Sequence, residues 1–185
     1  MAGANYLAFD IIGDLSFGAP FGMIEAGRDI ALAPKSLSDA DQKAVMNSYG
    51  KSKIESETHY IPAIEILNGR GEYSMSMGVL PPYWRPIVKE LPGYRFGNEC
   101  VQNLAGIAIM AVAKRLANPT DRADLLNKLQ SARDPDGNPF PKTELTAEAL
   151  TLLIAGSDTT SKYVFSLLIT LVVSLRRSLA ARLVP

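Results

Sequence analysis

The chain has 185 residues, 47% hydrophobic and 21% charged, which suits one folded domain or part of a larger one. Nineteen Lys and Arg residues balance nineteen Asp and Glu residues, so the net charge gives no reason to expect a nucleic-acid partner. Cys100 is the only cysteine and His59 the only histidine. An internal disulfide and a metal site built from several histidines are therefore excluded.

The N-terminal third is predicted to be helical. Residues 4–17 carry enough apolar side chains for a mostly buried helix, which Gly18 and Pro20 are expected to end. Residues 39–67 have the pattern of a further helix that is interrupted at Gly50 and Pro62. We find no strong strand pattern here or later in the chain, which favours an all-α fold class.

The middle of the chain is predicted to alternate irregular and helical segments. Residues 68–97 are rich in glycine and proline and are expected to be irregular, apart from a short helix near Trp84 to Glu90. Residues 98–117 place apolar residues three and four apart and predict a helix. Asp121 is a suitable N-cap for the next helix, and DPDGN at residues 134–138 predicts a turn.

The last long helix is expected to start near Thr143 or Thr146, and polar residues interrupt its most apolar part. The interruption reads LLIAGSDTTS at residues 152–161. In one interpretation Gly156 ends the helix and Ser157 or Asp158 caps a second one. In another, the helix is continuous but bent, and the hydroxyl groups donate back to carbonyl groups one turn earlier.

A third interpretation of the same residues is functional. Ala155 and Gly156 have almost no side chain, so a flat cofactor or a small ligand could lie against the backbone there. Asp158 and Thr159 would then place an acid and an alcohol beside it. This pair is suited to proton delivery in a site from which water is excluded.

The sequence AGSDTT, at residues 155–160, resembles the signature of the long central helix in the cytochrome P-450 family of haem-thiolate monooxygenases. Residues 145–161 resemble the first half of that helix, and residues 9–23 resemble a helix that fungal members carry upstream. Residues 78–93 and 101–109 follow in the order expected for the family. The resemblance is greatest to fungal benzoate 4-monooxygenase-like enzymes, which hydroxylate small aromatic acids.

This resemblance implies a fold and a reaction. Residues 1–161 would be a fragment of a cytochrome P-450 domain, with the helices upstream of the central helix and the first half of that helix. Ala155 and Gly156 would line the oxygen pocket on the distal side of a haem, and Asp158 and Thr159 would relay protons to the bound oxygen. The reaction implied is insertion of one oxygen atom of O2 into a small aromatic substrate.

The resemblance also implies partners and a location. Electrons would come from NADPH through NADPH–cytochrome P-450 reductase, and full-length members are expected at the endoplasmic reticulum membrane, although the family's membrane anchor has no match here. The cysteine loop that binds the haem iron has no match either, because Cys100 lies upstream of the central helix and its neighbours depart from the loop pattern. With no metal ligand expected in the chain, we expect it to be inactive alone.

Residues 162–185 do not resemble the family and are predicted to be a foreign tail, which an unspliced intron or a frameshift would explain. The apolar run 163–175 is shorter than the ~20 residues that span a bilayer, and Arg176 and Arg177 follow it. An alternative function is therefore a small helical protein that binds a partner or a membrane through this apolar and basic helix. A non-haem enzyme that uses Asp158 is a third hypothesis, which the single histidine disfavours.

Overall fold

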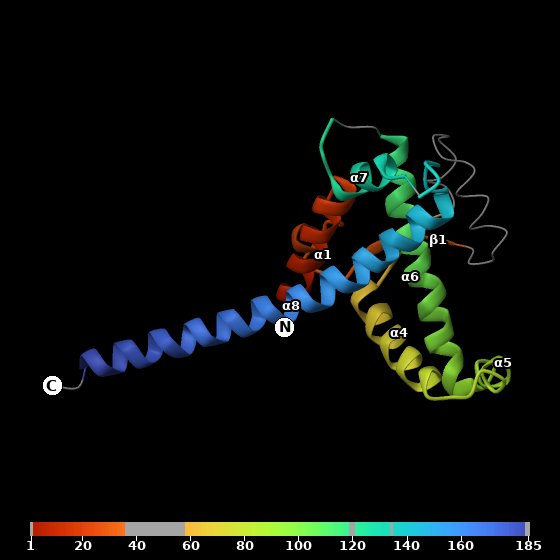
Figure 1. Ribbon diagram of the computed structural model, residues 1–185. Helices are drawn as coiled ribbons and strands as arrows, with labels where there is room; N and C mark the ends of the chain where they lie inside the picture. The colour runs from red at the N-terminus through yellow and green to blue at the C-terminus, as the bar shows by residue number, and fades with distance from the viewer. Residues whose placement is uncertain (1, 36–57, 119–120, 134, 184–185) are drawn as a thin grey trace.

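A computed structural model of the chain describes residues 2–35, 58–118, 121–133 and 135–183. The described part is helical apart from one small sheet, so the predicted all-α class is confirmed. Figure 1 shows the long helix α8 crossing α6, with α1 above α8 and α4 below it in this view. The elements are α1 Ala2–Phe17, α2 Met23–Ala26, β1 Ala31–Pro34, β2 Thr58–Ile61, α4 Ala63–Gly78, α5 Arg85–Val88, α6 Pro92–Ala117, α7 Leu125–Ser131 and α8 Lys142–Leu183.

The core lies where α1, α6 and the first half of α8 meet. Most of its largest fully buried side chains come from these three helices, among them Phe9, Leu104, Ile107 and Leu153, and Met23 of α2 and Leu126 of α7 are also fully buried. The second half of α8 projects away from the other elements in Figure 1, and from Tyr163 onward none of its described side chains is buried. Only the first half of α8 is therefore held in place by packing on described residues.

Two carboxylates hold the connections between helices. Asp10 on α1 accepts hydrogen bonds from three backbone N–H groups where α2 begins, at 2.8 to 3.1 Å. Asp29, before β1, accepts from the N–H groups of Ile64 and Glu65 at the start of α4, at 3.0 and 3.2 Å. The free N–H groups at a helix start need acceptors. Here the acceptors come from residues distant in sequence, so each cap also fixes a connection.

Helices α4 and α6 cross closely because glycine lies at their contact. A Cβ atom placed on Gly97 of α6 would lie 2.5 Å from the Cβ atom of Tyr73 on α4, closer than side-chain atoms pack. Cys100 packs in the same contact and is 1% exposed. It therefore behaves as the small buried residue that a lone cysteine most often is.

Three predictions about the elements need correction. Residues 68–78 are not irregular but continue α4, whose packing on α6 outweighs the low helix propensity of its glycines. β1 and β2 form an antiparallel pair with Ala31 opposite Ile61, in strands of four residues that are too short for a clear pattern. Asp124, not Asp121, caps α7, by accepting from the Asn127 N–H at 2.7 Å.

Other predictions are confirmed by the described residues. The helix predicted for residues 4–17 is α1, and the short helix near Trp84 is α5. The predicted turn after residue 133 contains Gly137 at φ +86° and brings Arg133 opposite Pro139. The helix expected over residues 39–67 lies mostly outside the described residues. Of its described part, residues 58–61 form β2 instead, and residues 63–67 begin α4 directly after Pro62.

Candidate active site

The polar stretch at residues 155–161 lies within one unbroken helix. α8 runs through Gly156 without interruption, so the prediction of a second capped helix is wrong. The Ser157 hydroxyl donates to the Leu153 carbonyl at 2.5 Å, and the Thr159 hydroxyl donates to the Ala155 carbonyl at 2.6 Å. These bonds are the ones expected of a continuous helix, because they satisfy the hydroxyl groups without interrupting the backbone.

One face of this stretch packs against α1. Ser157 and Ser161 are buried there, and Gly156 lies directly against Ile12. A Cβ atom added to Gly156 would be 2.5 Å from the Ile12 Cδ1 atom. The structure thus places Gly156 at the contact between α1 and α8, whereas Ala155 is exposed.

The opposite face of α8 is open among the described residues. Thr151, Ala155 and Thr159 follow one another at four-residue intervals and are all exposed. The methyl group of Ala155 is the only side-chain atom between the two threonine side chains on this stripe. We call these three residues the open face; it offers a flat surface with a hydroxyl group one turn to either side of Ala155.

Asp158 lies at the edge of the open face. Its carboxylate accepts from the Lys162 amino group at 2.7 Å, and the two side chains are 45% and 73% exposed. Lys162 was not among the predicted site residues, although an acid followed by a lysine four residues later signals such a pair on a helix. At this exposure the pair contributes little to stability, so either partner can be exchanged.

A small polar crevice borders Asp158 on its other side. It measures about 20 Å³ and is lined by residues of α1, α4 and α8, among them Asn5, Asn68 and Ser161. This volume holds about one water molecule, which needs at least two polar partners. The crevice offers those partners, so one water could reach the carboxylate from the side away from the open face.

Cys100 is unsuited to bind a metal or a haem iron where it lies. Burial raises the pKa of its thiol, and the negative charges of Glu65 and Glu99 raise it further. The thiolate is the form that binds metals, so a raised pKa opposes that role. Among the described residues, no group of three or more His, Cys, Asp or Glu side chains is placed to hold a metal ion.

Comparison with known proteins decides the family. The model of the family described as cytochrome P-450 matches residues 2–174. The chain belongs to the cytochrome P-450 family. The match includes residues 162–174, which the sequence assigned to a foreign tail, and the observed helices form an incomplete cytochrome P-450 fold.

Two fungal relatives show how much of a family member the chain represents. It is 46% identical over 164 residues to benzoate 4-monooxygenase bphA of Aspergillus niger, covering 85% of this chain and 28% of that protein. It is 27% identical over 160 residues to a cytochrome P-450 monooxygenase of Gibberella zeae, covering 85% of this chain and 30% of that protein. The chain thus spans less than a third of the length of these relatives.

Proposed function

We propose that this chain forms the distal wall of the active site in a haem monooxygenase that inserts one oxygen atom of O2 into a small aromatic substrate. The observation that carries the proposal is the open face of α8. Ala155 and Thr159 are exposed, whereas Gly156 lies against Ile12 of α1 and Ser157 is buried. In a helix that is otherwise packed in its first half, such a face is available to a ligand.

The open face fits one side of a haem. Ala155 presents no atom beyond Cβ, so a flat ring system can approach the helix closely, and Thr159 presents a hydroxyl group at the same level. Haem bound there would supply the activation of oxygen. Cys100 does not fit the thiolate ligand because it is buried on α6. We infer that the thiolate comes from residues outside this chain, and that the chain alone is inactive.

Thr159 and Asp158 would act on protons. In this structure the Thr159 hydroxyl donates to the Ala155 carbonyl, and a rotation about χ1 would aim it outward from the open face. Asp158 would exchange its bond to Lys162 for one to a water in the crevice and pass a proton toward Thr159. Asp158 thus moves the proton, and Thr159 holds it at the oxygen atom to be protonated.

The family and the relatives support a proposal for the substrate and for the source of electrons. The Aspergillus niger relative is named as a benzoate 4-monooxygenase, and 46% identity supports a small aromatic acid as the substrate class here. We propose that electrons come from NADPH through a cytochrome P-450 reductase. The family match makes the alternative of a small helical interaction protein the weaker hypothesis.

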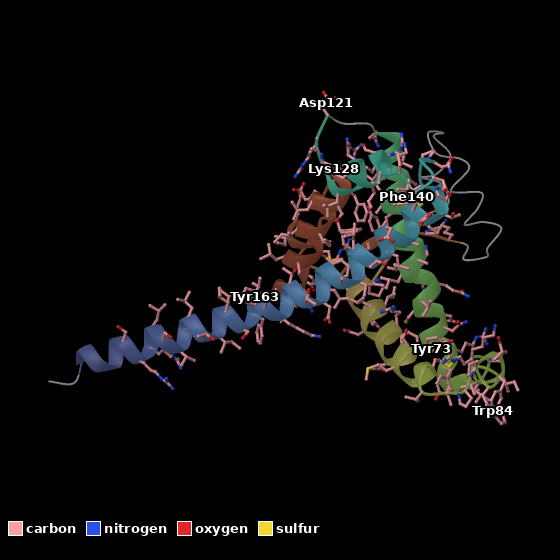
Figure 2. All side chains as sticks on the ribbon, viewed as in Figure 1. Tyr73, Trp84, Asp121, Lys128, Phe140 and Tyr163 are labelled. Atoms are coloured by element: carbon pink, nitrogen blue, oxygen red, sulfur yellow. The ribbon has the colours of Figure 1, made fainter. Side chains whose placement is uncertain are left out.

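Membrane association, at the endoplasmic reticulum, is the proposed location of the full-length protein. The α4–α5–α6 corner exposes several large apolar side chains, and Figure 2 shows Trp84 there, far from the α8 stretch that carries Tyr163. Arg85 and Lys89 lie among them, as at a surface that meets anionic headgroups. The exposed apolar residues of this corner are Met75, Val79, Tyr83, Trp84, Ile87, Leu91 and Phe96.

The domain boundary is also a proposal. We propose that residues 1–161 are the family segment and that residues 162–185 have another origin, even though the family match continues to residue 174. The support is that large apolar side chains are exposed over most of α8 after Tyr163, apart from a stripe formed by Ser166, Thr170 and Ser174. Natural helices that are apolar over most of their surface are normally buried in protein or lipid.

The function is tested in a chimera in which residues 2–161 replace the matching segment of the Aspergillus niger relative. We expect the chimera to bind haem and hydroxylate benzoate. Ala155→Phe should abolish hydroxylation because the ring fills the open face, whereas Ala147→Phe, at an exposed position two turns earlier, should not. Equal activity of both variants would show that the open face is not the distal wall.

A further inference from the structure

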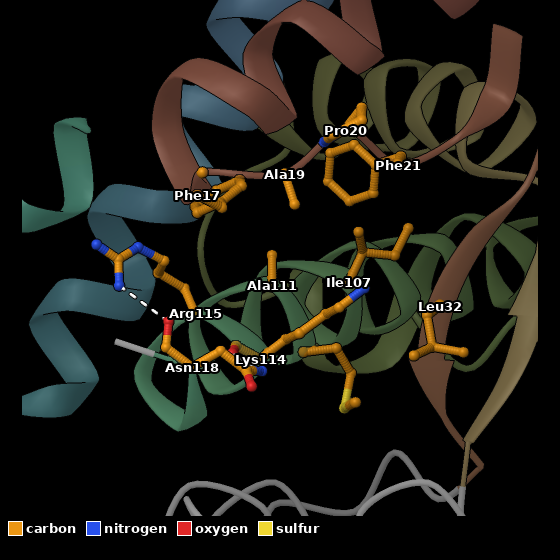
Figure 3. A pocket seen from close by; sticks show the side chains of 12 residues that line it. Phe17, Ala19, Pro20, Phe21, Leu32, Ile107, Ala111, Lys114, Arg115 and Asn118 are labelled. Atoms are coloured by element: carbon orange, nitrogen blue, oxygen red, sulfur yellow. Dashed lines mark hydrogen bonds between the residues drawn. The ribbon is translucent and has the colours of Figure 1, made fainter. Parts of the chain in front are cut away.

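A second hollow lies away from the open face. Its volume is about 270 Å³, and it is lined by residues of α1, the α1–α2 connection, β1 and α6 (Figure 3). Most of the lining is apolar, with Phe17 and Phe21 on one side and Leu32, Ile107 and Met110 among the rest. The two phenylalanine rings are held edge to face, with 6.4 Å between their centroids. A half-enclosed hollow with aromatic walls suits an apolar ligand.

One of the two positively charged side chains at this cavity has no partner among the described residues. Arg115 lines the cavity but donates to the Asp124 carboxylate at 2.5 Å and to the Asn118 carbonyl at 3.3 Å. Lys114 also lines it, and Figure 3 shows its side chain running along the α6 side toward Ile107. No ion pair or side-chain hydrogen bond of Lys114 is found among the described residues. A ligand in the cavity would therefore meet the Lys114 ammonium group as an available donor.

We propose that this cavity binds a small apolar carboxylate, with its hydrocarbon part against the phenylalanine rings and its carboxylate on Lys114. A cavity of about 270 Å³ is many times the ~10–15 Å³ that admits one water molecule, so it has room for a single aromatic ring with a carboxylate. Transfer of the ligand's hydrocarbon part out of water favours binding, and the charge of Lys114 sets the orientation of the ligand's carboxylate. This site is separate from the open face of α8 and does not rest on the function proposed for that face.

The test is a titration of the 185-residue chain with benzoate, which has about the required size, and with benzamide, its neutral isostere. Binding is followed by the methyl resonances of Ile107 and Met110, which line the cavity. We expect benzoate to shift both resonances and benzamide to bind more weakly. Lys114→Met should lower the affinity for benzoate about fivefold, which is the upper end for the loss of an exposed ion pair. The control is Lys128→Met, which changes an exposed lysine on α7 and should leave the affinity unchanged.

A second experiment tests the proposal by filling the cavity with a larger side chain. Figure 3 shows the Ala111 methyl group pointing into the cavity, so Ala111→Phe should abolish the shifts while leaving the helical circular dichroism unchanged. Binding that survives Ala111→Phe, or that is equal for benzoate and benzamide, would overturn the proposal. If Ala155→Phe abolishes benzoate binding and Ala111→Phe does not, benzoate binds at the open face. That result would sink the cavity site and leave the proposed function standing.

Discussion

At the residue scale, Ser157 and Thr159 make the same bond in different surroundings. Each hydroxyl donates to the carbonyl four residues earlier, but Ser157 is 1% exposed and faces α1, whereas Thr159 lies on the open face. The bonds alone are those of any serine or threonine in a helix. Exposure is what singles out Thr159, so a functional role for Ser157 has no support from its position.

The sequence was sufficient to find these residues but not to sort them. The AGSDTT stretch predicts a candidate site because a carboxylate and hydroxyl groups interrupt an apolar helix. Which residue meets α1 depends on the rotation of α8 about its axis, which is set by packing partners distant in the chain. That Gly156 lies against Ile12 could therefore not be predicted from the sequence.

Gly156→Ala should destabilise the chimera because the new methyl group meets Ile12 at 2.5 Å. The expected cost is about 1–3 kcal/mol for overpacking, less up to ~1 kcal/mol gained in helix propensity. In an Ile12→Ala background the cost should disappear, and Gly156→Ala should be neutral or stabilising. The double-mutant cycle is measured from urea unfolding. Equal effects in both backgrounds would contradict the contact.

Asp14 and Arg122 should make stability depend on acid pH. The Arg122 guanidinium group donates a hydrogen bond to the Asp14 carboxylate at 2.7 Å, and this bond lowers the pKa of Asp14. The contribution of this pair to the free energy of unfolding is therefore present above the unfolded-state pKa of ~3.9. It is lost as the pH falls through the lower folded-state pKa of Asp14.

The measurement is the urea midpoint of wild type and Asp14→Asn between about pH 6 and pH 2. Wild type should be the more stable at the upper end, and the difference should vanish at the lower end. A difference that stays constant over this range would show that the pair contributes nothing through the charge of Asp14. Both groups are exposed, so the effect is expected to be small.

At the element scale, helices with long apolar patterns were predictable and short or capped elements were not. α1 and α6 bury enough apolar residues to show a helical pattern. β1 and β2 have four residues each and exist because they pair with each other. Asp124 replaces Asp121 as the cap of α7 because it also pairs with the buried Arg115, a partner on another helix. Such long-range reasons cannot be read from local sequence.

The α4–α5–α6 corner should bind lipid. Trp84 is the only tryptophan, and its side chain is exposed in this corner, so its fluorescence reports on the corner alone. With vesicles that contain anionic lipid, we expect the emission to shift to shorter wavelength as the indole enters the interface. Arg85→Ser with Lys89→Ser should weaken this response, and raised salt should do the same. An emission maximum that vesicles leave unchanged would argue against membrane contact at this corner.

At the scale of the whole molecule, the second half of α8 dominates the expected behaviour in solution. Its exposed large apolar residues form a patch that no described residue covers, and such patches drive association. The purified chain should be helical, bind an apolar dye, associate and melt over a broad range. Light scattering and calorimetry test this, and a monomer with a sharp two-state transition would refute it.

Ending the chain at Ser161 should reduce that association, because it removes the exposed residues of α8 after the part that packs on α1. The same change in the chimera tests the domain boundary. A chimera that carries residues 2–161 should retain the carbon-monoxide band of thiolate-bound haem, whereas one that also carries residues 162–185 in place of the relative's own sequence should lose it. Retention of the band in both would place residues 162–185 within the family segment.

The central claim is that Asp158 and Thr159 deliver protons at the open face of α8, and the most direct test is the coupling of electrons to product in the chimera. Product formed and hydrogen peroxide released per NADPH consumed are measured for wild type, Thr159→Ala, Asp158→Asn and Ser157→Ala. Ser157→Ala is the matched control because it loses the same kind of hydrogen bond, worth about 1 kcal/mol, on the buried face. We predict that Thr159→Ala diverts NADPH into peroxide, that Asp158→Asn slows NADPH consumption, and that Ser157→Ala leaves coupling unchanged. Coupling that is the same in Thr159→Ala and Asp158→Asn as in wild type would contradict the claim and leave this stretch as an ordinary turn of helix.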